Sequence, residues 1–203
     1  KNRKCTMNNL APLVSEDAIT TTASSGFPAD EEIELLWRIG LFSPDDERAL
    51  RKLWRILKDQ TDDYLDMVLG MVAAYPALAA ALAAVRHDNW GGAEDGSTTV
   101  RQLFRQWLSE TCLSPHEPSW LNRLYSLYAD LPPERSAQAI SAELPGFRYL
   151  IALSFPLVAA ARALLTHAGL KSEAIERMQS ALLKAILLQV TLLSKLYVKD
   201  QLW

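Results

Sequence analysis

With 203 residues, the chain is long enough for one well-buried domain and short for two. About half of it is apolar (49%), 22% is charged, and the net charge of -3 gives no electrostatic reason to expect nucleic acid as a partner. The two cysteines, Cys5 and Cys112, make no disulfide framework, so we expect a reducing, cytoplasmic compartment.

No membrane-spanning helix and no signal peptide is predicted. Arg148 and Arg162 bracket one apolar run, and Lys184 and Lys195 interrupt the other. Neither run therefore reaches the roughly 18 uncharged residues that a spanning helix needs.

The first 28 residues are rich in Ser, Thr, Ala and Asn without periodicity, which predicts a mobile tail at 1–28 and one folded domain at 29–203. Carboxylates at residues 30–32 mark the first helix start. Ser43 and Pro44 supply an N-cap and an N1 proline for the second helix, which runs to about residue 58. The Gly-rich insert 87–96 is predicted to be a loop. Further helices are predicted at 59–75, 77–85, 97–113, 119–131, 146–167 and 173–198.

The last two predicted helices are apolar over most of their circumference. A helix of that kind is buried on most of its circumference. One side would face the core, and the other would face a second copy, which predicts a homodimer formed through 147–167 and 173–198. No segment alternates as a strand does, so the fold class is all-α.

Eight helical segments ending in a long pair suggest a globin-like packing. The chain resembles the protoglobins and the related globin-coupled sensor domains over roughly residues 30–200. The segments that carry this resemblance are Phe42-Ser43-Pro44-Asp45-Asp46-Glu47, Asp62-Asp63-x-Leu65-Asp66 with Gly70, Val72 and Pro76, Val100-Arg101 with Phe104 and Trp107, Trp120-Leu121 with Tyr125, Phe147-Arg148-Tyr149-Leu150-Ile151-Ala152 with Pro156, and Leu188-Gln189-Val190 with Leu192 and Tyr197-Val198-Lys199.

The resemblance implies a globin-like helical sandwich with an extra N-terminal helix and a long C-terminal helix pair. In the globin-coupled sensors that pair forms a four-helix bundle between two subunits. The resemblance also implies an apolar cavity that holds haem, with a histidine bound to the iron.

The residues at the expected iron-facing positions depart from the family pattern. Leu131 stands where the family supplies the proximal histidine, and its side chain has no lone pair to give to iron. On the distal side, Val68 and Leu69 replace a Trp-Tyr pair that shields bound gas. The sequence therefore predicts an apolar pocket without the usual haem anchor.

The remaining pocket positions are predicted to be apolar or aromatic. Leu150, Leu153 and Leu157 keep the lining apolar, and Phe104 is retained. Tyr128 lies one helical turn before Leu131, and a phenolate can hold haem iron. Core packing is the simpler interpretation of a tyrosine at this spacing.

Other residues could in principle bind iron, but each has a simpler explanation. The histidines fall in a loop, a turn and a helix end, where a solvent-facing or capping role is usual, and the methionines lie at core spacing. These residues are His87, His116, His167, Met67, Met71 and Met178.

No catalytic constellation and no metal cluster is predicted. The chain has no nucleophile elbow, no phosphate-binding glycine loop and no HExxH motif. Asp59, Asp62, Asp63 and Asp66 share one helix face, which we interpret as a solvated acidic face, with Asp59 near the helix junction paired to a basic side chain.

Two functional hypotheses remain open at this point. The first is a haemless globin-like sensor or interaction domain, dimeric, that binds an apolar ligand such as a fatty acid or a linear tetrapyrrole and passes its signal to a separate partner. The second is a haem protein that binds or senses O2, CO or NO through a non-standard axial ligand.

Overall fold

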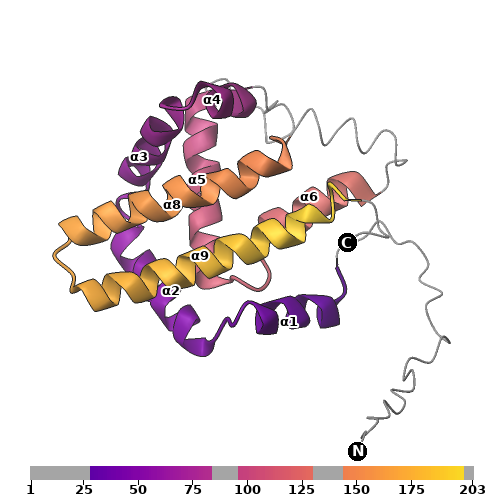
Figure 1. Cartoon of the computed structure of the whole chain (residues 1–203), viewed down its shortest axis with the longest axis horizontal. Helices are drawn as coiled ribbons and strands as arrows, with labels where there is room; N and C mark the ends of the chain where they lie inside the picture. Colours follow the sequence, from indigo (N-terminus) through magenta and orange to yellow (C-terminus); the bar gives the residue numbers. More distant parts are fainter. Residues whose placement is uncertain (1–27, 84–95, 130–143, 199–203) are drawn as a thin grey trace, which may run out of the picture.

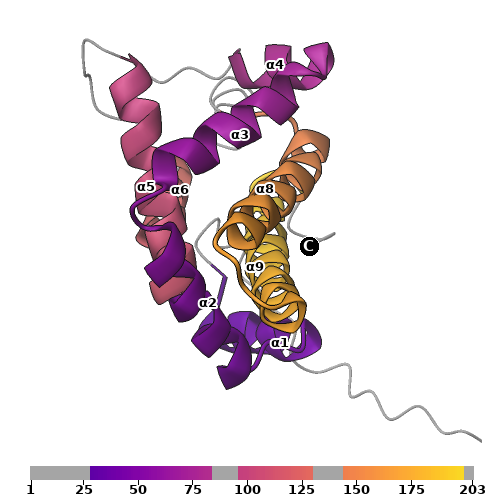
Figure 2. The same ribbon diagram turned by 90° about the vertical axis from the view of Figure 1, so that its left-hand side faces the viewer.

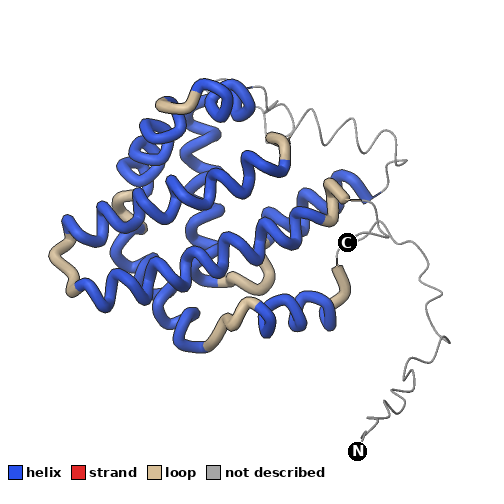
Figure 3. Tube along the Cα trace, in the orientation of Figure 1, coloured by secondary structure: helices blue, strands red, loops and turns tan. Residues whose placement is uncertain are grey.

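The computed structural model describes residues 28–83, 96–129 and 144–198 (Figure 1). All regular structure in these ranges is helical, as predicted (Figure 3). Apart from their last residues, the predicted tail 1–28 and loop 87–96 lie outside the described ranges. The helices are α1 (Asp30–Ile39), α2 (Pro44–Leu57), α3 (Thr61–Ala73), α4 (Pro76–Ala83), α5 (Gly96–Leu113), α6 (Ser119–Ala129), α8 (Phe147–His167) and α9 (Ser172–Ser194).

The helices form two layers. Figure 2 shows α8 and α9 side by side in one layer, with α2, α3, α5 and α6 in the other. Helix α9 packs against α8, α2 and α5, while α3 packs against α8. The extra helix α1 lies at the end of the sandwich and contacts α9. This arrangement is the all-α, globin-like sandwich that the sequence predicts.

The start of α2 follows the sequence signal closely. The Ser43 side chain accepts a hydrogen bond from the Asp46 backbone N–H at 3.4 Å, and Asp46 Oδ2 accepts one from the Ser43 backbone N–H at 2.9 Å. This reciprocal pair satisfies two N–H groups that the helix itself leaves unbonded. Helix α9 begins one residue earlier than the predicted 173, with Lys171 as the N-cap and Ser172 as the first helical residue.

A partly buried ion pair fixes the turn between α1 and α2 onto α9. Lys184 Nζ donates to the Leu41 carbonyl oxygen at 2.9 Å and to Asp46 Oδ2 at 2.9 Å. Burial alone would raise the pKa of Asp46, but hydrogen bonds from Lys184 and Ser43 outweigh it and lower that pKa. The carboxylate therefore stays charged and holds the turn in place.

Two hydrophobic clusters make up the core, and α9 contributes to both. The larger one joins α2, α3, α5, α8 and α9, where Leu50, Leu53 and Leu182 are fully buried. The smaller one joins α1 and α6 to the second half of α9 around Leu192. The predicted wide apolar surface of α9 is thus used inside the domain over much of its circumference.

Helix α8 is long and apolar enough to cross a membrane when judged by length and composition alone. Its mean hydropathy reaches 1.7 over an 18-residue window, although Arg148 and Arg162 lie within its 21 residues. The sequence prediction required an uncharged run, and the run between Arg148 and Arg162 is shorter than 18 residues, whereas a test by mean hydropathy admits both charges. Core helices pass the same test, so the result is weak evidence for a membrane span.

The start of α6 is held against α5 by the carboxylate of Glu110. Its Oε1 accepts hydrogen bonds from Ser119 Oγ and Gln106 Nε2, both at 2.7 Å, and its Oε2 accepts one from the Trp120 backbone N–H at 3.2 Å. Burial on its own would raise the pKa of Glu110, but these bonds outweigh it and lower the pKa. The carboxylate thus caps α6 and ties it to α5.

We expect Glu110→Gln to lower the free energy of unfolding by about 1 kcal/mol near neutral pH. The pKa of Glu110 is lower in the folded chain than in the unfolded chain, where a glutamate titrates at about 4.3. Its stabilising effect is therefore complete above that value and is lost as the pH falls through the folded-state pKa. Urea unfolding from neutral pH to about pH 3 should show the difference between wild type and variant shrinking.

The control for this experiment is Glu117→Gln, because Glu117 is exposed and its side chain makes no hydrogen bond within the described structure. It should change stability little at any pH. A Glu110→Gln effect of constant size across the titration would contradict the assigned role.

Candidate functional site

A partly open cavity of about 690 Å³ lies between the two layers. Its described lining comes from α3, α4, α5, α6, α8 and α9, together with residues 144–145 before α8. Most of the lining is aliphatic or aromatic. The lining residues with a polar side-chain group are Gln106, Trp107, Trp120, Arg123 and Gln189.

Most of the predicted pocket residues that the structure describes do line this cavity. They come from three helices that are distant in sequence and meet around one space. Leu69 is at the rim, since it lines the cavity and is also 44% exposed. The predicted lining residues found there are Leu69, Phe104, Leu150, Leu153 and Leu157.

Val68, also predicted as a pocket residue, is not among the residues that line this cavity. It is buried in the larger core cluster instead. Successive residues of a helix are about 100° apart, so the face of α3 that presents Leu65, Leu69 and Val72 to the cavity turns Val68 away from it. The other two predicted positions, Leu131 and the side chain of Tyr128, lie outside the described residues, so their roles remain predictions.

A buried polar network lies beside the cavity, and sequence reasoning assigned it no role. Trp107 Nε1 donates to Gln189 Oε1 at 3.3 Å, and Gln189 Nε2 donates to Thr111 Oγ1 at 3.1 Å. Gln189 is only 2% exposed and Thr111 is fully buried. The pattern that could have indicated this network is a glutamine among the buried apolar residues of α9, at helical spacing between Ile186 and Leu193.

Two aromatic side chains of α5, Phe104 and Trp107, line the cavity, and Tyr64 of α3 packs against Phe104 without lining it. The rings of Tyr64 and Phe104 meet edge to face at 5.2 Å, and Phe104 lies 5.5 Å from Trp107. The Tyr64 hydroxyl donates to the Leu157 carbonyl oxygen on α8 at 2.7 Å. Burial strongly raises the pKa of Tyr64, so this hydroxyl remains a proton donor.

The described lining does not fit a haem held through its iron. Histidine, cysteine, methionine and tyrosine are the side chains that hold haem iron, and none of them lines the cavity among the residues described. His116 packs against Trp37 with ring centroids 4.2 Å apart, and His167 ends α8 at the surface. Burial raises the pKa of the Cys112 thiol to about 12, so no thiolate is available there.

The remaining candidate ligands are also accounted for. Met67, Met71 and Met178 pack within or against the larger core cluster, and none of them lines the cavity. His87 lies outside the described residues.

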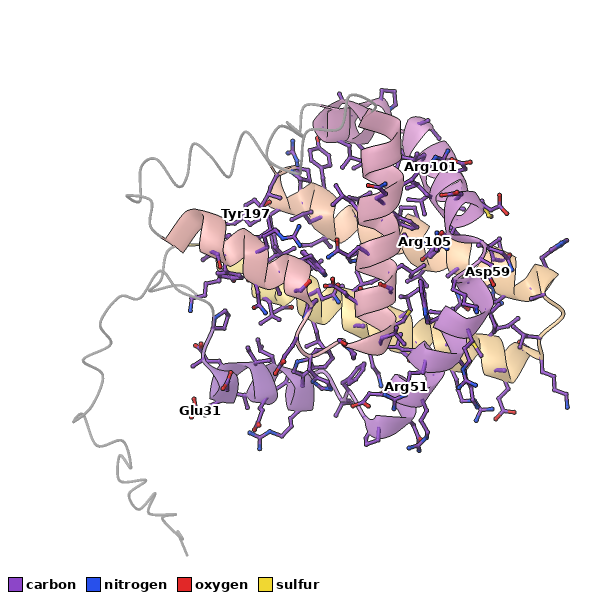
Figure 4. The ribbon with its side chains drawn as sticks, turned by 180° about the vertical axis from the view of Figure 1, so that it is seen from behind. Glu31, Arg51, Asp59, Arg101, Arg105 and Tyr197 are labelled. Carbon is purple, nitrogen blue, oxygen red and sulfur yellow. The ribbon has the colours of Figure 1, made fainter. Side chains whose placement is uncertain are left out.

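The acidic face of α3 pairs with basic side chains rather than gathering around a metal site. Arg101 reaches from α5 towards α3 (Figure 4), where it lies 2.8 Å from Asp66 and 3.5 Å from Asp62. Lys58 Nζ is 3.9 Å from Asp59, which is the pairing expected for that residue. Within the described ranges, no three His, Cys, Asp or Glu side chains are close enough to hold a metal ion.

We expect Gln189→Leu to lower the free energy of unfolding by about 1–3 kcal/mol, because it leaves the Trp107 N–H and the buried Thr111 hydroxyl without their partner. Urea unfolding measures the change. The control is Gln179→Leu, on the same helix. Gln179 is partly buried and accepts a hydrogen bond from Arg162, and its replacement should lower the free energy of unfolding less. A Gln189→Leu variant as stable as the wild type would show that the network does not hold α5 to α9.

Comparisons with known proteins agree with this geometry. A search of curated proteins gives no match, whereas the model of the protoglobin family matches residues 29–203. The matched range contains all the described helices, in a sandwich whose layers enclose an apolar cavity. The chain belongs to the protoglobin family.

Proposed function

We propose that this chain is a haemless, globin-like sensor or interaction domain that binds an apolar ligand in the cavity between its layers. The observation that carries the proposal is the cavity itself. It measures about 690 Å³, and its described lining is mainly apolar and offers no group of the kinds that hold haem iron.

The size and chemistry of the cavity suit a small apolar ligand. Pockets that bind small molecules usually measure roughly 300–1,000 Å³ and combine apolar walls with a few placed polar groups. Protoglobins normally bind haem. With Leu131 at the proximal position, the same space would serve another apolar molecule.

The alternative is a haem protein with a non-standard axial ligand, which would bind or sense gas. Family membership favours it. The axial ligand would have to come from outside the described lining, and Tyr128 is the sequence candidate. A haem titration separates the two functions.

On adding haem to the purified protein, we expect no intense Soret absorption, because the described cavity residues provide no iron ligand. Native mass spectrometry of protein purified without denaturation should instead show a co-purified apolar mass. A stoichiometric Soret band would favour the gas-binding alternative and overturn the haemless function.

We further propose that the domain forms a homodimer through the outer faces of α8 and α9, which would make a four-helix bundle. No described helix lies over these faces in Figure 1. They expose Phe155 (69%), Leu187 (41%) and Ile151 (39%), which are large apolar side chains that a partner would bury. Leu153 and Leu157 of α8 line the cavity, so one helix would connect the ligand with the dimer interface.

Phe155→Glu should weaken dimerisation roughly a hundredfold, because it places an unpaired charge in an apolar interface. We expect light scattering at micromolar concentration to show a dimer for the wild type and a monomer for the variant. Leu35→Glu is the control, because Leu35 is a half-exposed leucine on α1, away from the proposed interface. A wild-type monomer at that concentration would rule out the proposed dimer.

A further inference from the structure

The only charged residue among the described lining of the cavity is Arg123 of α6. Its side chain is exposed, as is usual for an arginine whose aliphatic part covers apolar surface while its guanidinium reaches water. None of the hydrogen bonds or ion pairs of the described structure involves the Arg123 side chain. The cavity therefore has one cationic group with unused hydrogen-bonding capacity.

Trp120 lines the cavity one helical turn before Arg123, on the same face of α6. Its Nε1 is buried and has no hydrogen-bond acceptor. A buried donor without an acceptor costs free energy, which an oxygen atom of a ligand would recover. Two neighbouring donors on α6 thus lack an acceptor.

No carboxylate competes for these donors within the described lining. The nearest acidic group on α5, Glu110, is occupied by Ser119, Gln106 and the Trp120 backbone N–H. Gln189 also lines the cavity, and its amide oxygen accepts hydrogen bonds from Trp107 and Thr111. The lining donors that have no acceptor, on Arg123 and Trp120, lie on one helix of a mainly apolar cavity.

We propose that the ligand is an apolar monocarboxylic acid, with its hydrocarbon part in the cavity and its carboxylate at Arg123. This inference rests on the proposed function and names the ligand class. One cation matches one carboxylate, and a charge-assisted hydrogen bond from a guanidinium is stronger than a bond between neutral groups. The Trp120 N–H provides a second donor on the same side.

Two ligands that differ only at the polar end test the proposal. We measure the binding of dodecanoic acid and of dodecanol by isothermal titration calorimetry, below their aggregation concentrations. The wild type should bind the acid about tenfold more tightly than the alcohol, as expected for a hydrogen bond to a charged group. Arg123→Gln should remove most of that preference, because it should lower the affinity for the acid and leave the affinity for the alcohol unchanged.

The control variant is Arg55→Gln, because Arg55 is an exposed arginine on α2 that does not line the cavity. It should alter the affinity for neither ligand. Raising the salt concentration should weaken binding of the acid but not of the alcohol, since the interaction at Arg123 lies near water.

The results distinguish a failure of the carboxylate assignment from a failure of the proposed apolar-ligand function. If acid and alcohol bind the wild type equally, or if Arg123→Gln keeps the full preference for the acid, the carboxylate assignment is overturned and the apolar cavity function stands. If neither binds, the apolar-ligand function itself fails, and the carboxylate assignment fails with it.

Discussion

The burial of α9 is the constraint on which the rest of the structure depends. This helix belongs to both hydrophobic clusters and therefore contacts elements from the start, middle and end of the chain. Hydrogen bonds fix its position. Lys184 donates to the α1–α2 turn, Gln189 accepts from Trp107 of α5, and the Leu192 carbonyl oxygen accepts from the Tyr125 hydroxyl of α6. Apolar burial supplies most of the stabilisation, and the buried polar pairs fix the register of the helices.

The cavity lies between the two layers and is lined by side chains from both. Leucines and aromatic rings surround a space that they do not fill, which is unusual in a close-packed interior. An unfilled apolar space of this size forgoes dispersion contacts, so a ligand that fills it would stabilise the folded state by mass action. This link between occupancy and stability is what a sensing role would require.

A signal could leave the cavity through the helices that enclose it. Helix α8 presents Leu153 and Leu157 to the cavity and Phe155 to the opposite, outer side. A ligand changes an equilibrium only through different affinities for two states, and a dimer interface on the same helix offers two such states. The proposed dimer and the proposed ligand are thus coupled through one element.

The sequence by itself determined the all-α class and the helix order, and it predicted a shared apolar pocket for Leu69, Phe104, Leu150, Leu153 and Leu157. Helical periodicity and capping residues are local signals, and the spacing of the matched segments fixes the order of the helices. The tertiary structure decided that Val68 faces the core, that Gln189 pairs with Trp107, and that Arg123 and Trp120 reach the same cavity. Those facts depend on the rotation and crossing of helices distant in sequence, and rotation by a single residue position turns a side chain by about 100°.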